Sequence, residues 1–122
     1  MVDETSTIIP FHHGGGAAAA SSPQQIFFTR EELQYILNIY GRMVSAGHWK
    51  DYAMQAGKEQ ACFAIFQRAS ERPLYRITKT PKLERKQGAY ALISAQGQIL
   101  KRGHDLRQLL KYFDRKFFKL IP

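Results

Sequence analysis

The chain carries few residues in arrangements that would perform catalysis. Its single cysteine, Cys62, would need His48 or His104 as a base to act as a nucleophile. Cys62 lies in the most apolar stretch of the sequence, where a free cysteine usually behaves as a small buried hydrophobe. One cysteine forms neither an internal disulfide nor a structural zinc site, and no spacing pairs two carboxylates. We therefore expect no catalytic residues, no metal site and no cofactor.

Basic side chains give the clearest chemical signal in the sequence. The segment from 76 to 86 is opposed only by Glu84 and contains Arg76, Lys79, Lys82, Arg85 and Lys86. Pro81 disfavours a helix at Thr80, so residues 80–83 are expected to be extended, within a loop from Thr80 to Gln87 that faces solvent or a partner. A second basic cluster, Lys101, Arg102 and His104, follows a predicted hairpin. A helix beginning near His104 would add the positive end of its dipole.

We interpret the two clusters as one positive surface that binds a polyanion, RNA or DNA, in a protein that is not an enzyme. In this hypothesis the phosphates contact Lys79, Lys82, Arg85, Lys86, Lys101 and Arg102, with Arg76 and His104 at the margin. Five aromatic residues beside basic positions would suit base stacking, although most are expected in the core: Tyr75, Tyr90, Tyr112, Phe117 and Phe118.

Two other functions fit the same residues. A protein-interaction adaptor would present the positive surface to an acidic protein partner, or use the apolar segment at residues 8–11 as a docking peptide. An enzyme acting on an anionic small molecule would place Arg102 and His104 in a pocket. The sequence does not distinguish RNA from DNA, and it does not define the oligomeric state.

Charge is divided unevenly along the 122 residues. Residues 1–25 hold two acids and no Lys or Arg, whereas residues 26–122 hold all 18 basic residues and eight acids, a balance of +10. The first segment is low in bulky apolar groups and is predicted to be a disordered low-complexity tail. No apolar run reaches the ~20 residues that span a bilayer, and no secretory signal is present. We expect a cytoplasmic protein without membrane association.

Local patterns predict the elements that position these residues. Thr29 and Glu32 form a capping box that begins a helix over residues 30–46. The apolar face of this helix is predicted to contain Leu33, Ile36, Leu37, Tyr40, Met43 and Val44. Trp49 follows the helix and is expected to seal the junction between helix and sheet.

Strands are predicted near residues 51–56, 61–68, 74–79, 88–95 and 98–102, with a final helix near 104–114. The near-continuous apolar run at 61–68 indicates a central strand covered on both faces. The order favours a single small α+β domain over residues 26–122, with an N-terminal helix, an approximately five-stranded, mainly antiparallel sheet and a short C-terminal helix.

Several short motifs of this sequence are similar to motifs of a known family. They include Phe28-Thr29, Tyr40-Gly41-Arg42-Met43-Val44, Trp49-Lys50-Asp51-Tyr52, Pro73-Leu74-Tyr75-Arg76-Ile77, Lys79-Thr80-Pro81-Lys82-Leu83, Gln87-Gly88-Ala89-Tyr90 and Arg102-Gly103-His104-Asp105-Leu106. Over about residues 27–112 the chain resembles an uncharacterised family of short, basic alphaproteobacterial proteins classed as a domain of unknown function. The resemblance implies a single cytoplasmic domain and supplies no activity, ligand or catalytic residue.

Overall fold

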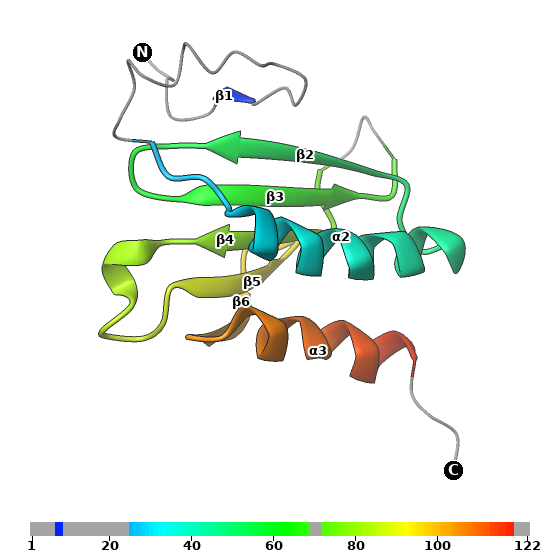
Figure 1. Cartoon of the computed structure of the whole chain (residues 1–122). Coiled ribbons are helices and arrows are strands. Elements are labelled where there is room, and N and C mark those ends of the chain that lie inside the picture. The colour runs from blue at the N-terminus through cyan, green and yellow to red at the C-terminus, as the bar shows by residue number, and fades with distance from the viewer. Residues whose placement is uncertain (1–6, 9–24, 69–71, 119–122) are drawn as a thin grey trace.

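Six strands form one antiparallel sheet in which neighbours along the chain are neighbours in space (Figure 1). The computed structural model describes residues 7–8, 25–68 and 72–118. Its elements are β1 Thr7–Ile8, α2 Arg30–Ser45, β2 Asp51–Ala56, β3 Ala61–Phe66, β4 Tyr75–Lys79, the 3-10 turn η2 Pro81–Leu83, β5 Tyr90–Ser94, β6 Ile99–Gly103 and α3 Leu106–Phe117. The predicted α+β class, with its two helices and antiparallel sheet, is confirmed.

Strand β1 is an addition to the predicted sheet. Thr7 and Ile8 pair with Ala56 and Gln55 of β2, although they lie in the segment for which the sequence predicts disorder. The remainder of that segment, up to residue 24, lies outside the described residues. No helix in the described part of the chain has the length and apolar character needed to cross a membrane.

Helix α2 begins at the predicted capping box. The backbone N–H of Glu32 donates to Thr29 Oγ1 at 3.1 Å, and the backbone N–H of Thr29 donates to Glu32 Oε1 at 2.7 Å. Two orphan backbone donors are thereby satisfied at the first turn. The helix ends at Ser45, close to the predicted boundary.

The buried face of α2 differs from the predicted one. Ile36, Ile39 and Met43 are its buried residues, whereas Leu37 and Val44 remain 37% and 40% exposed. Each of those two residues directly follows a buried one, and a step of about 100° around the helix turns it away from the sheet. The predicted face was therefore too wide on one side, and it omitted Ile39.

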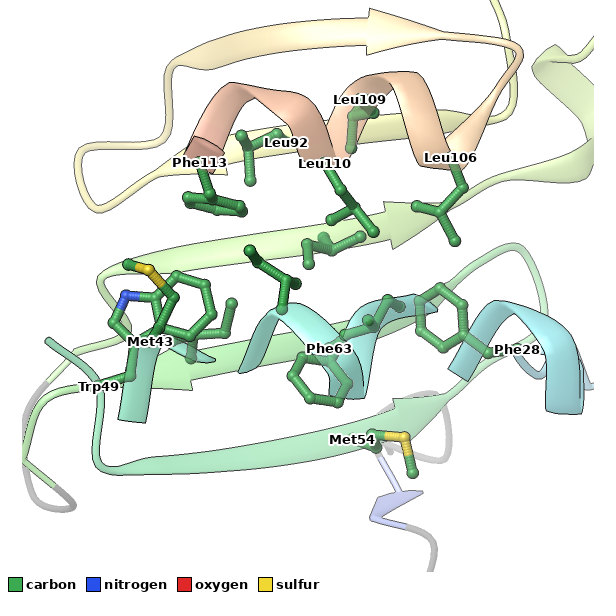
Figure 2. Close-up of a cluster of buried hydrophobic side chains, with 14 of the residues drawn as sticks. Phe28, Met43, Trp49, Met54, Phe63, Leu92, Leu106, Leu109, Leu110 and Phe113 are labelled. Atoms are coloured by element: carbon green, nitrogen blue, oxygen red, sulfur yellow. The ribbon is translucent and has the colours of Figure 1, made fainter. Parts of the chain in front are cut away.

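Both helices pack on the same face of the sheet. Met54, Phe63, Ile77 and Leu92 lie opposite one another on β2 to β5 and form the floor of the core. Leucines of α3 and residues of α2 cover them (Figure 2). Trp49 is 1% exposed, with its ring 4.9 Å from the ring of Phe113, so it closes this core as expected.

The second face of the sheet carries no helix in the described part of the chain. In β3, Phe63 and Ile65 point toward the helices, whereas Cys62, Ala64 and Phe66 lie on this helix-free face and are half-buried. The covering that the sequence predicts for this second face of β3 therefore stays a prediction, because the described residues place a helix on the first face only. A short apolar run of β3's length does not reveal whether one or two layers cover it.

A β-bulge in β6 determines which of its side chains reach each face. The register shifts between Leu92 and Ile93, so that Leu92 pairs with Lys101 while Ile93 pairs with Ile99. The extra residue, Leu100, packs against the core. Ile99 and Arg102 consequently lie together on the helix-free face.

Candidate anion-binding surface

Most of the predicted phosphate-binding residues gather at one end of the sheet. Here β4 ends, the loop around η2 begins, β6 ends and both helices start (Figure 1). We call this the loop end. Arg76 is the exception, because it lies in the middle of the helix-free face, opposite Ala64 and Ile93.

Lys79 is engaged in a structural ion pair. Its ammonium donates to Glu32 Oε1 and to the backbone oxygen of Phe27, each at 2.9 Å. The hydroxyl of Tyr90 donates to the other oxygen of Glu32. The Lys79 and Glu32 side chains are only 16% and 13% exposed, so the pair joins α2 to the sheet on the helix-covered face.

The carboxylate of Glu32 is held in its ionised form. Burial alone would raise the pKa of Glu32, but the hydrogen bonds from Tyr90 and Lys79 and the backbone bond at Thr29 outweigh it and lower that pKa. The same arrangement raises the pKa of Tyr90, through burial first and through its bond to the carboxylate second. Lys79 therefore has a defined partner within the fold.

Two more of the predicted residues form ion pairs on the surface. The ammonium of Lys82 contacts Glu59, and the two side chains are each 64% exposed. This bond lowers the pKa of Glu59. His104 Nδ1 lies 3.1 Å from Glu84 Oε2, also at an exposed position. Exposed pairs of this kind contribute little to stability, because solvent screens them, so a phosphate competes with the carboxylate at little cost.

The start of α3 does not offer its amides to an external anion. The helix begins at Leu106, and Asp105 Oδ1 accepts hydrogen bonds from the backbone N–H of Arg107 at 2.9 Å and of Gln108 at 3.4 Å. The expected positive helix end beside His104 is thus neutralised by the chain's own carboxylate.

The helix-free face provides a second location for basic side chains. Arg102 projects from β6 onto this face, and its Nη1 donates to the backbone oxygen of Gly88 at 3.4 Å, which ties it to the loop. Arg76 projects from β4 and is exposed. Arg85, Lys86 and Lys101 are exposed as well, and none of them forms an ion pair with a described carboxylate.

The remaining strand residues of the helix-free face are mostly small or apolar. Asp51 supplies the only strand carboxylate within the described part of this face, and it lies at the far side of the sheet from Arg102. The other members are Ala53, Gln55, Cys62, Ala64, Phe66, Thr78, Ala91, Ile93 and Ile99. The alternation of residues in β3 was the sequence signal for this face. The presence of Arg102 on it was not evident from the sequence, because it depends on the bulge in β6.

The aromatic residues beside basic positions belong to the core side, as mostly expected. Tyr75, Tyr90, Tyr112, Phe117 and Phe118 are half-buried and pack against the core. Phe66 is the aromatic strand residue that lies on the helix-free face. Base stacking at the surface of the sheet therefore depends on Phe66 and on the planar guanidinium groups.

Cys62 has the properties of a structural thiol. It is half-buried, and burial raises its pKa to about 11, although the charge of Arg76 opposes the shift. A thiol with such a pKa is almost wholly protonated near neutral pH and is a poor nucleophile. Among the described residues, no three His, Cys, Asp or Glu side chains are placed to hold a metal ion.

Comparison with known proteins places the domain in a family. The sequence model of a family described as "Protein of unknown function (DUF2794)" matches residues 26–110. The chain belongs to this family. No curated protein and no solved structure matches it. The match confirms the resemblance to a domain of unknown function, and it spans α2, strands β2 to β6 and the first part of α3.

Proposed function

We propose that this DUF2794 domain binds single-stranded nucleic acid, RNA or DNA, across its helix-free face and the adjoining loop. The observation that carries the proposal is the placement of Arg76 and Arg102 on the helix-free face. The other described strand residues of this face are small, apolar or uncharged, except for Asp51 at its far side. Arginine pairs with phosphate in a bidentate manner and stacks on bases, so both groups suit this ligand.

Four basic side chains carry the phosphate contacts in this proposal. They lie on the helix-free face or in the loop and form no ion pair with a described carboxylate: Arg76, Arg85, Lys86 and Arg102. Lys101 is not among them, because it pairs with Leu92 and so lies on the helix-covered side of β6. Lys79 is excluded by its bonds to Glu32 and Phe27. Lys82 and His104 join only by exchanging an exposed carboxylate partner for a phosphate.

The shape of the face favours a single strand over a duplex. Reading a duplex groove requires a protruding helix or ribbon, and both helices lie on the opposite face of the sheet. Ala53, Ala64 and Ala91 keep the centre of the face low. Arg76 and Arg102 lie on β4 and β6, whose backbones are roughly 10 Å apart because one strand lies between them. A low floor that carries these two arginines accommodates an extended nucleic-acid single strand.

Salt dependence of binding tests the proposal. Four engaged side chains predict a log–log slope of about −2.8 for a single-stranded oligonucleotide. Replacing Arg76→Gln and Arg102→Gln together is expected to flatten the slope by about 1.4. The matched control is Lys111→Gln with Arg115→Gln, which removes the same charge from exposed positions of α3 on the other side of the molecule.

Two results would contradict nucleic-acid binding at this face. One is the absence of binding at low salt. The other is an equal loss in the two double variants, which would indicate attraction to net charge alone. An acidic protein that stays bound after nuclease treatment, and is lost only with Arg76→Gln and Arg102→Gln, would instead establish the adaptor function for the same surface.

A further inference from the structure

A cavity of about 470 Å³ lies at the end of the sheet opposite the loop end. Its walls come from the β5–β6 hairpin, the last turn of α3 and the residues that precede β2 and β4. Four aromatic residues line it, namely Trp49, Tyr75, Tyr112 and Phe117. Its volume falls in the range of about 300–1,000 Å³ that small-molecule sites occupy.

The aromatic walls hold one another in place. The rings of Tyr75 and Tyr112 lie 6.4 Å apart in an edge-to-face arrangement, and His48 packs against Phe117 with ring centroids 4.6 Å apart. Trp49 and Tyr75 both also contact Phe113, a buried residue of α3 (Figure 2 shows Trp49 and Phe113 at the same end of the core). Packed rings of this kind form a largely preformed site for a flat ligand.

The charges around the cavity select an anion. The ammonium of Lys116 lies 5.9 Å and 5.8 Å from the ring centroids of Tyr112 and Phe117 and forms no ion pair with a described carboxylate. No Asp or Glu is among the described residues that line the cavity. Lys116 lies in the last turn of α3, beside the aromatic residues that it contacts.

Trp49 supplies an unused hydrogen-bond donor at the same place. Its side chain is 1% exposed, and its indole nitrogen has no hydrogen-bond partner among the described residues. The nitrogen itself is covered by neighbouring atoms, so it is not a contact for a ligand in the cavity. Because the Trp49 ring lines the cavity, the indole N–H instead reports on a ligand that packs against that ring.

We propose that this cavity binds a small molecule with one flat aromatic ring and one carboxylate. The ring lies between the aromatic walls, and the carboxylate accepts a hydrogen bond from Lys116. The proposal is independent of the nucleic-acid surface, because the two sites lie at different ends of the sheet and share no residue.

The single tryptophan allows a direct test with the full chain. Benzoate is titrated while the one indole N–H cross-peak is followed by ¹⁵N–¹H NMR. We expect a saturable shift of that cross-peak, and weaker binding of acetate, benzylamine and cyclohexanecarboxylate, which lack the ring, the negative charge or the flatness. Lys116→Gln is expected to weaken benzoate binding about tenfold or more, as for loss of a charged hydrogen bond.

Lys111→Gln is the matched control, because it removes the same charge from an exposed position of α3 outside the cavity. Its affinity for benzoate should equal that of the unaltered protein. The proposal is overturned if the indole cross-peak stays in place at saturating benzoate concentrations, if benzylamine binds as well as benzoate, or if both lysine variants lose affinity equally. The double variant Arg76→Gln with Arg102→Gln should leave benzoate binding unchanged. The nucleic-acid proposal and the cavity proposal can therefore fail independently of each other.

Discussion

At the scale of single residues, the fold depends most on polar groups that meet only after the chain has folded. Glu32 is the clearest case, because it caps its own helix and also accepts bonds from Lys79 and Tyr90, which are 47 and 58 residues away. The capping role was predictable from the Thr29 to Glu32 spacing. The ion pair was not, since nothing local links Glu32 to Lys79, and the sequence assigned that lysine to a phosphate.

Replacing Glu32→Gln should lower the free energy of unfolding at pH 7 by about 1–3 kcal/mol, because a buried lysine would lose its charged partner. The lowered pKa of Glu32 also gives the stability of the unaltered protein an acid limb. This contribution is fully present above the unfolded pKa of about 4.3 and is lost as the pH falls through the lower folded pKa. Urea unfolding between pH 3 and pH 7 measures both effects.

The neighbouring variant Glu31→Gln is the control, because Glu31 is exposed and bonds only to Tyr35 among the contacts described for it. It should keep both the stability and the acid limb. A Glu32→Gln protein with unchanged stability and unchanged pH dependence would show that the Lys79–Glu32–Tyr90 cluster does not stabilise the fold.

At the scale of elements, local sequence signals located the helices and strands, but not their faces. The predicted strand at 51–56 has the bounds of β2, and the Ala95 to Gln98 turn joins β5 to β6 as expected. Those features depend on neighbouring residues. The exposure of Leu37 depends instead on which side of α2 packs against the sheet, and the bulge at Leu100 depends on pairing with β5.

At Gly88 the loop before β5 approaches the end of β6 closely. It has a φ of 101°, and a Cβ added there would lie 2.3 Å from the carbonyl carbon of Gly103 at the end of β6. Gly88→Ala should therefore cost about 2–5 kcal/mol of stability, since left-handed backbone strain and overpacking both contribute. Chemical denaturation of the purified variant gives this value.

Gly97→Ala separates the two contributions. Gly97 has a similar φ of 90°, but an added Cβ meets nothing within 4 Å. We expect it to cost only about 1–2 kcal/mol, from backbone strain alone. If the two variants were equally stable, the contact between Gly88 and Gly103 would relax without cost, and β5 and β6 would not need a glycine there.

At the scale of the whole molecule, the placement of both helices on one face creates two unlike regions. The helix-free face and the loop carry unpaired basic groups, whereas the aromatic cavity lies at the opposite end, on the helix side. Composition and charge clustering predicted the first region in part. They gave no sign of the second, because Trp49, Tyr75 and Tyr112 come from three separate parts of the chain and each resembles an ordinary core residue.

The first 24 residues provide a test at this scale. They contain Asp3 and Glu4 and no Lys or Arg, so deleting them raises the formal net charge from +8 to +10. Of their described structure, only Thr7 and Ile8 pair with the sheet, and we expect a fall in Tm of no more than about 4–8 °C, equivalent to ~1 kcal/mol. Affinity for a single-stranded oligonucleotide should rise modestly at low salt and converge with that of the full chain at high salt.

The full chain with Asp3→Asn and Glu4→Gln has the same net charge as the deletion and serves as its control. If the tail acts only through its charge, the two proteins should bind the oligonucleotide equally at every salt concentration, because long-range electrostatics depend on charge and not on the presence of the segment. Binding by the deletion protein that is much tighter than by the neutralised chain, and that persists at high salt, would contradict this expectation. Such a result would mean that the segment competes with nucleic acid for the surface formed by Arg76 and Arg102.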